Sequence, residues 1–238
     1  MNAPFAPVAP VAPFAPFVMV VTGMDFEAGI AAGPHCRVVH GLRGIELEQE
    51  VSAMASRACR GIVSFGVAGG LDPALAPGDL IIADEVRAPG ERYDTAADWT
   101  HALHAALPHA RIGPIAGADE PVLDVAAKQA LRQASGALCV DMESHLAARM
   151  AAACRLPFAA CRVVIDPASR AVPAAAAAGM GEGGKTDVAA VLGGLLRAPW
   201  QLPALLRLAG DAAAARGALR AARLAVGDAF ALRGVLQQ

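Results

Sequence analysis

Short apolar segments typical of β-strands alternate along this chain with longer segments whose apolar residues recur at helical spacing. Residues 45–60 and 142–154 are two of the helical segments. Helices that alternate with apolar strands pack on both faces of a sheet whose strands run largely parallel. The sequence therefore predicts a three-layer α/β fold with a mixed, largely parallel, twisted sheet and helices on both faces. The clearest strand-like segments are residues 17–21, 62–65, 79–83, 112–116 and 158–165.

The length of the chain fits a single domain. An α/β chain of 238 residues can bury one hydrophobic core, and domains of this size are routinely single units. Residues 1–16 form a proline- and alanine-rich leader without the cationic start of a signal peptide. We therefore predict a disordered leader over residues 1–16 and one domain over residues 17–238. Its last part, from about residue 187 to residue 238, is predicted to be an arginine-rich helical segment.

Charge and cysteine content exclude several classes of function. The formal net charge is −2 and no basic patch is interleaved with aromatic residues, so nucleic-acid binding is not expected. The five cysteines form no C-x-x-C pair, which is typical of a reduced, cytoplasmic protein. The most apolar late stretch, residues 188–208, is interrupted by arginines and prolines, so no membrane span is predicted.

Three of the expected strands end at residues suited to a ligand pocket. The run 158–165 ends at Asp166, and the segment Cys139–Glu143 opens a helix with an acid in its first turn. The strand at residues 62–65 is expected to break into a glycine turn over residues 66–70. An acid at the C-terminal end of a buried strand usually faces a ligand crevice. The sequence therefore predicts a pocket where these strand ends meet.

These segments, together with residues 23–27, carry a family resemblance. They resemble the purine nucleoside phosphorylase and nucleosidase superfamily, in register from about Val18 to Asp166 and more loosely through the C-terminal segment. Within that superfamily the chain is most similar to the hopanoid-associated phosphorylases. The resemblance implies a nucleoside-phosphorylase-like fold, a homo-oligomer, and the release of adenine from adenosylhopane, a purine nucleoside linked to a lipid.

The resemblance also implies roles for four side chains. Cleavage of a purine N-glycosidic bond passes through an oxocarbenium-like sugar. It needs an acid at the leaving base, a nucleophile on the opposite face and a grip on the ribose hydroxyls. The implied acid is Asp166, which would protonate or hydrogen-bond N7 of the purine. Glu143 would accept the ribose hydroxyls, Met142 would pack under the sugar, and Glu27 would orient the attacking water.

Each of the three acids also has a purely structural interpretation. Asp166 precedes Pro167 and could simply begin a turn. Glu143 could be a surface charge at a helix start, and Glu27 could lie on the solvated face of a short helix.

The remaining pocket residues bear on the nucleophile. Val67 stands where relatives often carry a hydroxyl, and the loss of that group, with Glu27 retained, favours hydrolysis. The name of the hopanoid subgroup favours phosphorolysis, with Arg43 as the nearest phosphate ligand, so water and phosphate both stay open. We expect no metal and no organic cofactor, and phosphate only as a co-substrate of phosphorolysis. The predicted nucleoside and phosphate pocket consists of Gly66, Val67, Ala68, Gly69, Val122 and Arg43.

Two further segments are compatible with other functions. Residues 179–186 match the P-loop pattern G-x-x-x-x-G-K-[ST]. A P-loop follows a strand, whereas Pro173 and five alanines precede this segment and form strands poorly, so a mobile loop at the pocket rim is preferred. Residues 195–232 place arginines beside an apolar stripe, which is typical of a helix on an anionic membrane surface or of a helix packed on the domain.

Three alternatives therefore stand beside adenosylhopane cleavage. The first is a methylthioadenosine or adenosylhomocysteine nucleosidase, which shares the chemistry but accepts a small thioether at the 5′ position. The second is a non-catalytic protein that binds membrane surfaces through the arginine-rich segment. The third is a P-loop nucleotide binder.

Overall fold

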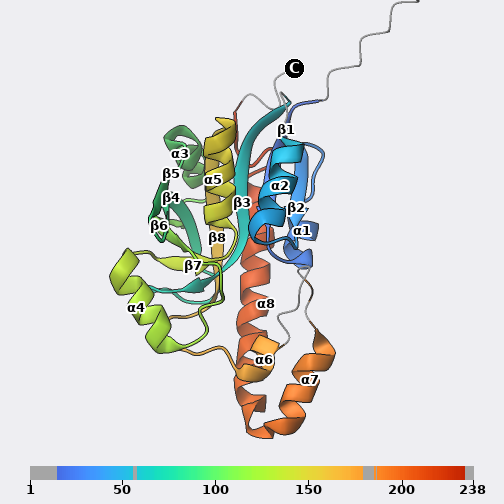
Figure 1. Cartoon of the computed structure of the whole chain (residues 1–238), viewed down its shortest axis with the longest axis vertical. Coiled ribbons are helices and arrows are strands. Elements are labelled where there is room, and N and C mark those ends of the chain that lie inside the picture. Colours follow the sequence, from blue (N-terminus) through green and yellow to red (C-terminus); the bar gives the residue numbers. More distant parts are fainter. Residues whose placement is uncertain (1–14, 56–57, 179–184, 186, 234–238) are drawn as a thin grey trace, which may run out of the picture.

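The computed structural model describes residues 15–55, 58–178, 185 and 187–233. Within these residues eight strands form one sheet: β1 (Phe17–Thr22), β2 (Cys36–His40), β3 (Cys59–Gly70), β4 (Leu80–Ala88), β5 (Glu91–Asp94), β6 (Arg111–Gly117), β7 (Cys139–Asp141) and β8 (Phe158–Asp166). The order is β2-β1-β3-β7-β6-β4-β5, and β8 pairs with both β3 and β4 (Figure 1). These two pairings of β8 close a barrel-like ring with β3, β7, β6 and β4.

Most neighbouring strands run parallel. β1 pairs in parallel with β2 and β3, β3 pairs in parallel with β8, and β6 pairs in parallel with β4 and β7. The antiparallel pairs are β3 with β7, β4 with β5, and β4 with β8. Parallel pairs require crossover connections, which the intervening helices supply. The predicted mixed, largely parallel sheet is confirmed.

Helices cover both faces of this sheet (Figure 1). On one face α2 and α5 bury Leu47 and Leu146, and on the other α3 and α8 bury Leu103 and Leu219. Successive residues of β1 alternate between these two clusters, as the period of a strand requires. The predicted three-layer arrangement is therefore confirmed. The described helices are α1 (Asp25–Ala31), α2 (Gly44–Met54), α3 (Ala97–Ala106), α4 (Val125–Ser135), α5 (Ser144–Cys154), α6 (Ala174–Ala178), α7 (Val188–Arg197), the 3-10 helix η2 (Pro199–Gln201) and α8 (Leu202–Ala225).

The glycine segment of β3 differs from the prediction of a turn. The strand continues through residues 66–70 in extended conformation. Its pairing with β8 shifts register between Ala68 and Gly69, and Gly69 and Gly70 pair with β7. Because this segment is paired along its length, its glycines do not reverse the chain. They let neighbouring side chains approach the strand.

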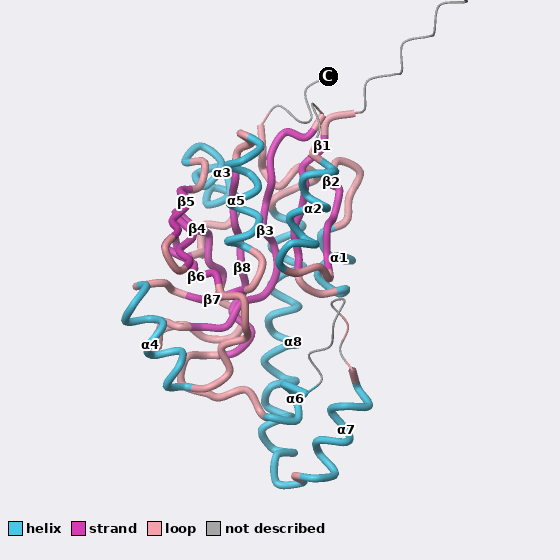
Figure 2. The backbone as a smooth tube through the Cα atoms, in the orientation of Figure 1, coloured by secondary structure: helices cyan, strands magenta, loops and turns pink. Residues whose placement is uncertain are grey.

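The C-terminal helices extend beyond the sheet. Figures 1 and 2 show α7 and the first half of α8 projecting below the strands, with α6 beside them. The second half of α8 packs on the sheet, where Ala215, Leu219 and Ala222 are buried. The arginine-rich segment is thus divided into a projecting part and a packed part. The predicted leader lies outside the described residues, apart from positions 15 and 16.

Candidate active site

A buried arginine lies at the centre of the candidate site. Arg162 sits in the middle of β8 with a fully buried side chain. Its Nε lies 2.8 Å from Oδ2 of Asp141, and its Nη2 lies 3.4 Å from Oε2 of Glu143. Nη2 also donates a hydrogen bond to Oγ of Ser64. A guanidinium removed from water needs such partners, because an unpaired buried charge is strongly destabilising.

Asp141 connects this arginine to the start of α5. Its Oδ1 accepts hydrogen bonds from the backbone N–H groups of Glu143, at 3.0 Å, and Ser144, at 2.7 Å. Carboxylate oxygens at a helix start satisfy backbone donors that lack partners within the helix. Asp141 therefore fixes where α5 begins and places Glu143 next to Arg162.

Glu27 is also buried, with 1% of its surface exposed. Its Oε2 accepts hydrogen bonds from the backbone N–H groups of Gly23 and Met24, both at 2.8 Å, and its Oε1 accepts one from Val67 at 2.6 Å. Burial raises the pKa of Glu27, opposed by the charge of Arg162 and by these N–H donors. The interpretation of Glu27 as a solvated residue is therefore wrong. Its carboxylate joins the start of α1 to β3.

Two glycines make room for these carboxylates. A Cβ at Gly23 would lie 2.5 Å from Oε1 of Glu143. A Cβ at Gly66 would lie 2.5 Å from Oε1 of Glu27 and 2.7 Å from Nη1 of Arg162. A side chain at either position would displace these charged groups from their present places, so the two glycines allow their close approach to the backbone. The predicted pocket residue Gly66 thus lies against the charged groups of the site.

The acidity of Glu143 is also perturbed by its surroundings. Its side chain is 13% exposed, and burial raises its pKa to about 7, opposed by Arg162 and reinforced by Asp141 and Glu27. The carboxylates of Glu27, Asp141 and Glu143 surround the single guanidinium of Arg162. We call these four residues the Arg162 cluster. Burial first, and then the excess of negative charge in the cluster, favour the protonated form of Glu143.

Asp166 belongs to a second charged pair. Lys128 of α4 is fully buried, and its ammonium pairs with Oδ2 of Asp166. The same Nζ donates to the carbonyl oxygens of Pro167, at 3.1 Å, and Arg170, at 2.9 Å. Burial raises the pKa of Asp166, and the charge of Lys128 opposes this rise. A Cβ at Gly69 would make ordinary contact with Oδ1 of Asp166 at 3.6 Å, so the carboxylate lies beside the end of β3.

Sequence reasoning did not identify Arg162 or Lys128. Arg162 had a signal, because it is the single charge inside the apolar run 158–165. A charge at such a position must be paired in the folded protein. Lys128 had none, since a lysine in a helix that also contains glutamine and arginine is normally solvated.

The remaining predicted residues occupy varied positions around the site. Val67 contributes its backbone N–H to Glu27, whereas Ala68 is buried in the core. Val122 packs against the small cluster that contains Val140. Arg43 is exposed at the start of α2 but close enough to lower the pKa of Glu143, and Met142 is half-buried. The structure therefore brings Glu27, Glu143, Gly66 and Val67 together, whereas Asp166, at the end of β8, lies beside Gly69 farther along β3.

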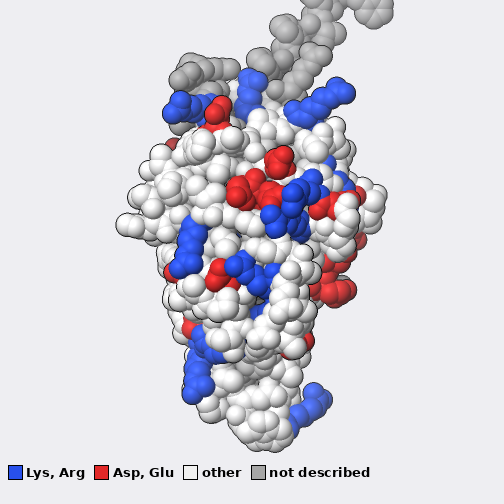
Figure 3. Space-filling view, turned by 90° about the vertical axis from the view of Figure 1, so that its left-hand side faces the viewer, with Lys and Arg blue, Asp and Glu red and all other residues white. Residues whose placement is uncertain are grey.

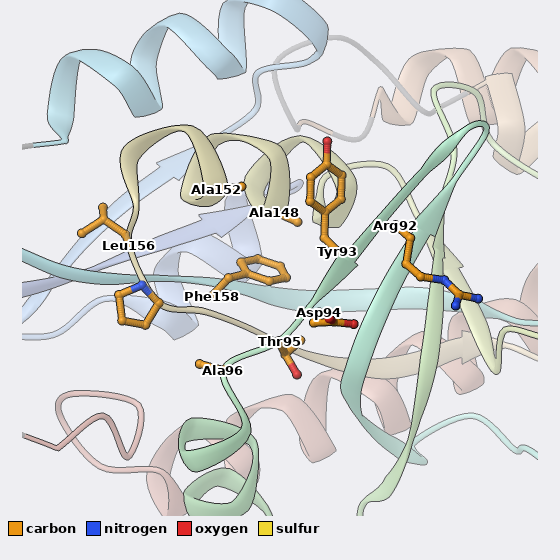
Figure 4. Close-up of a pocket in the computed structure, with 10 residues that line it drawn as sticks. Arg92, Tyr93, Asp94, Thr95, Ala96, Ala148, Ala152, Leu156 and Phe158 are labelled. Atoms are coloured by element: carbon orange, nitrogen blue, oxygen red, sulfur yellow. The ribbon is translucent and has the colours of Figure 1, made fainter.

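Two hollows among the described residues bear on the position of the site. A cavity of about 280 Å³ lies beside Asp166, with Ala204, Arg207 and Leu208 of α8 on its other side. A larger hollow of about 350 Å³ lies beside Tyr93 and contains no predicted site residue. Figure 4 shows that α5, β5 and the segment leading to α3 surround this second hollow. Of these two hollows, the cavity beside Asp166 is the one that a predicted site residue lines.

Most of the P-loop match lies outside the described residues, which include only Lys185 of residues 179–186. The segment before it is described, and residues Ala174–Ala178 form the helix α6. A P-loop requires a strand at that place. The structure of the preceding segment therefore argues against a P-loop.

A family model described as the phosphorylase superfamily matches residues 15–197. The match covers β1 to β8 and α1 to α7, and α8 lies beyond it. None of the curated protein sequences that were compared matches the chain.

Solved structures share the fold. The 5′-methylthioadenosine/S-adenosyl homocysteine nucleosidase of Campylobacter jejuni has a TM-score of 0.58 and 18% identity, covering 66% of this chain and 89% of its own. The S-adenosylhomocysteine nucleosidase of Streptococcus pyogenes has a TM-score of 0.58 and 18% identity, covering 66% and 86%. The futalosine hydrolase of Helicobacter pylori has a TM-score of 0.56 and 16% identity, covering 65% and 89%. At these identities the similarity shows a common fold.

Proposed function

Because this chain belongs to the phosphorylase superfamily, we propose that it cleaves the N-glycosidic bond of a purine nucleoside. The observation that carries this proposal is the burial of three carboxylates, those of Glu27, Glu143 and Asp166, around the glycine-containing end of β3. Burial raises the pKa of all three. An acid, a base and an acceptor for hydroxyl groups are what such a cleavage needs.

In the proposed hydrolysis, the bond from C1′ of the ribose to N9 of the purine breaks, and a bond from C1′ to a water oxygen forms. Glu27 takes the proton that this water loses, and Asp166 gives a proton to N7 of the leaving purine. Glu143 accepts hydrogen bonds from the ribose hydroxyls. A raised pKa suits Asp166 as an acid, because more of it is protonated near neutral pH.

Water is supported as the nucleophile over phosphate. Val67 offers no hydroxyl, its backbone N–H is already bonded to Glu27, and Arg43 is exposed. Mass spectrometry of the products, formed with and without phosphate, tests this choice. We expect the free ribosyl product under both conditions. A sugar 1-phosphate that forms whenever phosphate is present would show that phosphate is the nucleophile.

The proposed substrate is a 5′-substituted adenosine, and among these adenosylhopane. The two nucleosidases that share the fold are named for 5′-methylthioadenosine and S-adenosylhomocysteine, which are adenosines substituted at the 5′ position. The hopane group follows from the family resemblance of residues 18–166. With this substrate the protein would act in the cytoplasm, as a homo-oligomer, at the inner membrane surface. Faster adenine release from methylthioadenosine than from adenosylhopane would favour the nucleosidase alternative.

Replacing Glu143 by alanine should weaken riboside binding by roughly 10- to 100-fold, the value of a hydrogen bond to a charged acceptor. The side chain lies beside Gly23 and Arg162, where it is available to the sugar hydroxyls in the proposed complex. Binding of the matching 2′-deoxyriboside should fall much less, since one of the two hydroxyls is missing. KM for the two substrates measures the difference.

Glu143→Gln is the matched control, because the amide keeps the shape and one acceptor oxygen but not the charge. The riboside affinity of Glu143→Gln should lie between that of the wild type and that of Glu143→Ala. In the wild type, riboside affinity should fall as the pH drops through about 7, where Glu143 takes up a proton and becomes a weaker, uncharged acceptor. Equal losses for riboside and deoxyriboside in Glu143→Ala would remove Glu143 from the sugar.

A further inference from the structure

The projecting end of the C-terminal helices has an unusually apolar surface. We call residues 188–210 the helical tip, which comprises α7, η2 and the first part of α8. None of these residues is buried. Large apolar side chains spaced four residues apart run along α7 and across the bend, with Leu196 85% exposed and Trp200 75% exposed. The exposed large apolar residues of the tip are Val188, Leu192, Leu196, Trp200, Leu202 and Leu206.

Contiguous apolar surface of this kind marks a contact site in a folded protein, whereas single exposed leucines do not. No single helix in the described part of the chain is long and apolar enough to cross a membrane. Residues Val188–Arg197 and Pro199–Ala225 pass that test only as a pair, bent by 115°. A bent pair that presents apolar side chains at its outer end is shaped to lie in a surface.

The charges of the tip identify the surface that it fits. Residues 188–210 contain no aspartate or glutamate, and their two charged residues, Arg197 and Arg207, are both exposed. Arginines that flank apolar and tryptophan side chains suit the interface of an anionic bilayer. Figure 3 shows the lower end of the molecule as largely uncharged, with basic side chains at its margins. A second copy of the chain that met this one tip to tip would offer the two arginines no acidic partner within residues 188–210.

Two other arginines of the segment contact the domain. Arg223 is buried and donates to the carbonyl oxygens of Ala31, at 3.0 Å, and Gly227, at 2.6 Å. The guanidinium of Arg216 lies 4.3 Å from the ring centre of Phe26. This part of α8 is therefore held on the domain. The interpretation of the whole arginine-rich segment as a membrane-binding helix is wrong for Arg223, and the surface available to lipid lies toward the bend.

The base of the tip borders the candidate site. The cavity beside Asp166 is lined on its α8 side by Ala204, Arg207 and Leu208, and Arg170 pairs with Asp211 at 2.7 Å. The helix that projects from the domain thus also forms a wall next to the proposed catalytic acid. A nucleoside whose 5′ group remains in a bilayer could reach this cavity along α8.

We propose that the helical tip docks into the surface of an anionic lipid bilayer, with Leu196 and Trp200 inserted and Arg197 and Arg207 at the headgroups. Docking would bring the enzyme to a substrate whose lipid group lies in the bilayer. Only this biological purpose rests on the proposed function; the docking itself does not. The apolar side chains supply the larger share of the binding, since the two arginines by themselves contribute little.

The test compares the full-length wild type with the variant Leu196→Ser/Trp200→Ser in sedimentation with vesicles of phosphatidylcholine and phosphatidylglycerol in equal parts. We expect the double substitution to weaken binding by on the order of tenfold or more. Leu224→Ser is the matched control, because Leu224 is 83% exposed but lies outside the tip. It should bind like the wild type. Binding of the wild type to pure phosphatidylcholine vesicles should be weaker, as the arginines then have no anionic partner.

Tryptophan fluorescence gives a second readout. Trp99 is buried, and its Nε1 donates to the carbonyl oxygen of Phe230 at 2.7 Å, so emission that shifts to shorter wavelength on adding vesicles reports Trp200. A wild type that neither sediments with the vesicles nor shifts its emission overturns the proposal. So does an equal loss in Leu224→Ser, or a wild-type oligomer that the double substitution converts to monomers without any vesicle binding.

Purine release from a soluble adenosine analogue is measured on the same three proteins. Its absence in all of them would count against the proposed function, whereas the vesicle results would still decide the docking. Equal turnover in all three proteins, with vesicle binding lost only in the double variant, supports both the proposed function and the docking.

Discussion

Replacement of Asp166 by asparagine is expected to lower turnover by about 10²–10⁴, which is the usual contribution of a general acid. The amide can still hydrogen-bond N7 of the purine, but it has no proton to transfer. Nucleoside binding and the fold should be preserved, since asparagine has nearly the same shape. Single-turnover kinetics and nucleoside affinity, measured on the same preparation, separate the two effects.

Lys128 supplies the control for this experiment. Asp166→Asn leaves the buried ammonium of Lys128 without its carboxylate, so the variant also loses stability. The double variant Asp166→Asn/Lys128→Met removes both charges and should recover much of that stability without recovering turnover. Turnover that returns with stability would assign Asp166 a structural role only. Wild-type turnover in folded Asp166→Asn would return Asp166 to its interpretation as a turn residue.

Lys128→Met alone tests how the lysine acts. The charge of Lys128 lowers the pKa of Asp166, so its removal should raise that pKa further. The alkaline limb of the pH–rate profile, where the acid loses its proton, should therefore move to higher pH. Lys128 is in this sense a positioning residue, because it acts on the reaction through Asp166.

Replacement of Arg162 by methionine is expected to lower the free energy of unfolding by about 3–5 kcal/mol, the cost of leaving buried charges unpaired. The side chain is fully buried and its charge faces Glu27, Asp141 and Glu143. Denaturant unfolding measures the loss. If Arg162→Met does not fold, Arg162→Lys keeps the charge but not the forked geometry, and it should show a smaller loss.

The loss of unfolding free energy in Arg162→Met should depend on pH. The pKa values of Glu27 and Glu143 are already raised by burial, and without Arg162 they rise further. An acid with a raised pKa in the folded state binds protons more tightly there than in the unfolded chain. The deficit relative to wild type is therefore smallest near the ordinary glutamate value of 4.5 and grows as the pH rises through about 7. A loss that does not vary with pH would mean that these carboxylates do not face Arg162.

The sequence by itself determined the layers of the fold and the positions of the acids. Alternating apolar runs and helical segments specify a largely parallel sheet with helices on both faces, because each element must bury its apolar side. The ends of these elements placed Glu143 and Asp166 at the edge of the sheet, whereas the role of Glu27 came from the family resemblance. Such signals are local, since they depend on the period of a strand or helix and on the residue at its end.

Only the tertiary structure decided which charges meet. Lys128 and Asp166 are 38 residues apart, and nothing in the sequence of α4 indicates that its lysine is buried. Residues 66–70 have the composition of a turn, but pairing with β7 and β8 keeps them in a strand. The C-terminal segment reads as one arginine-rich helix, yet contact with the domain holds Arg223 and leaves the tip uncovered. Burial and pairing depend on neighbours distant in sequence, so local patterns cannot specify them.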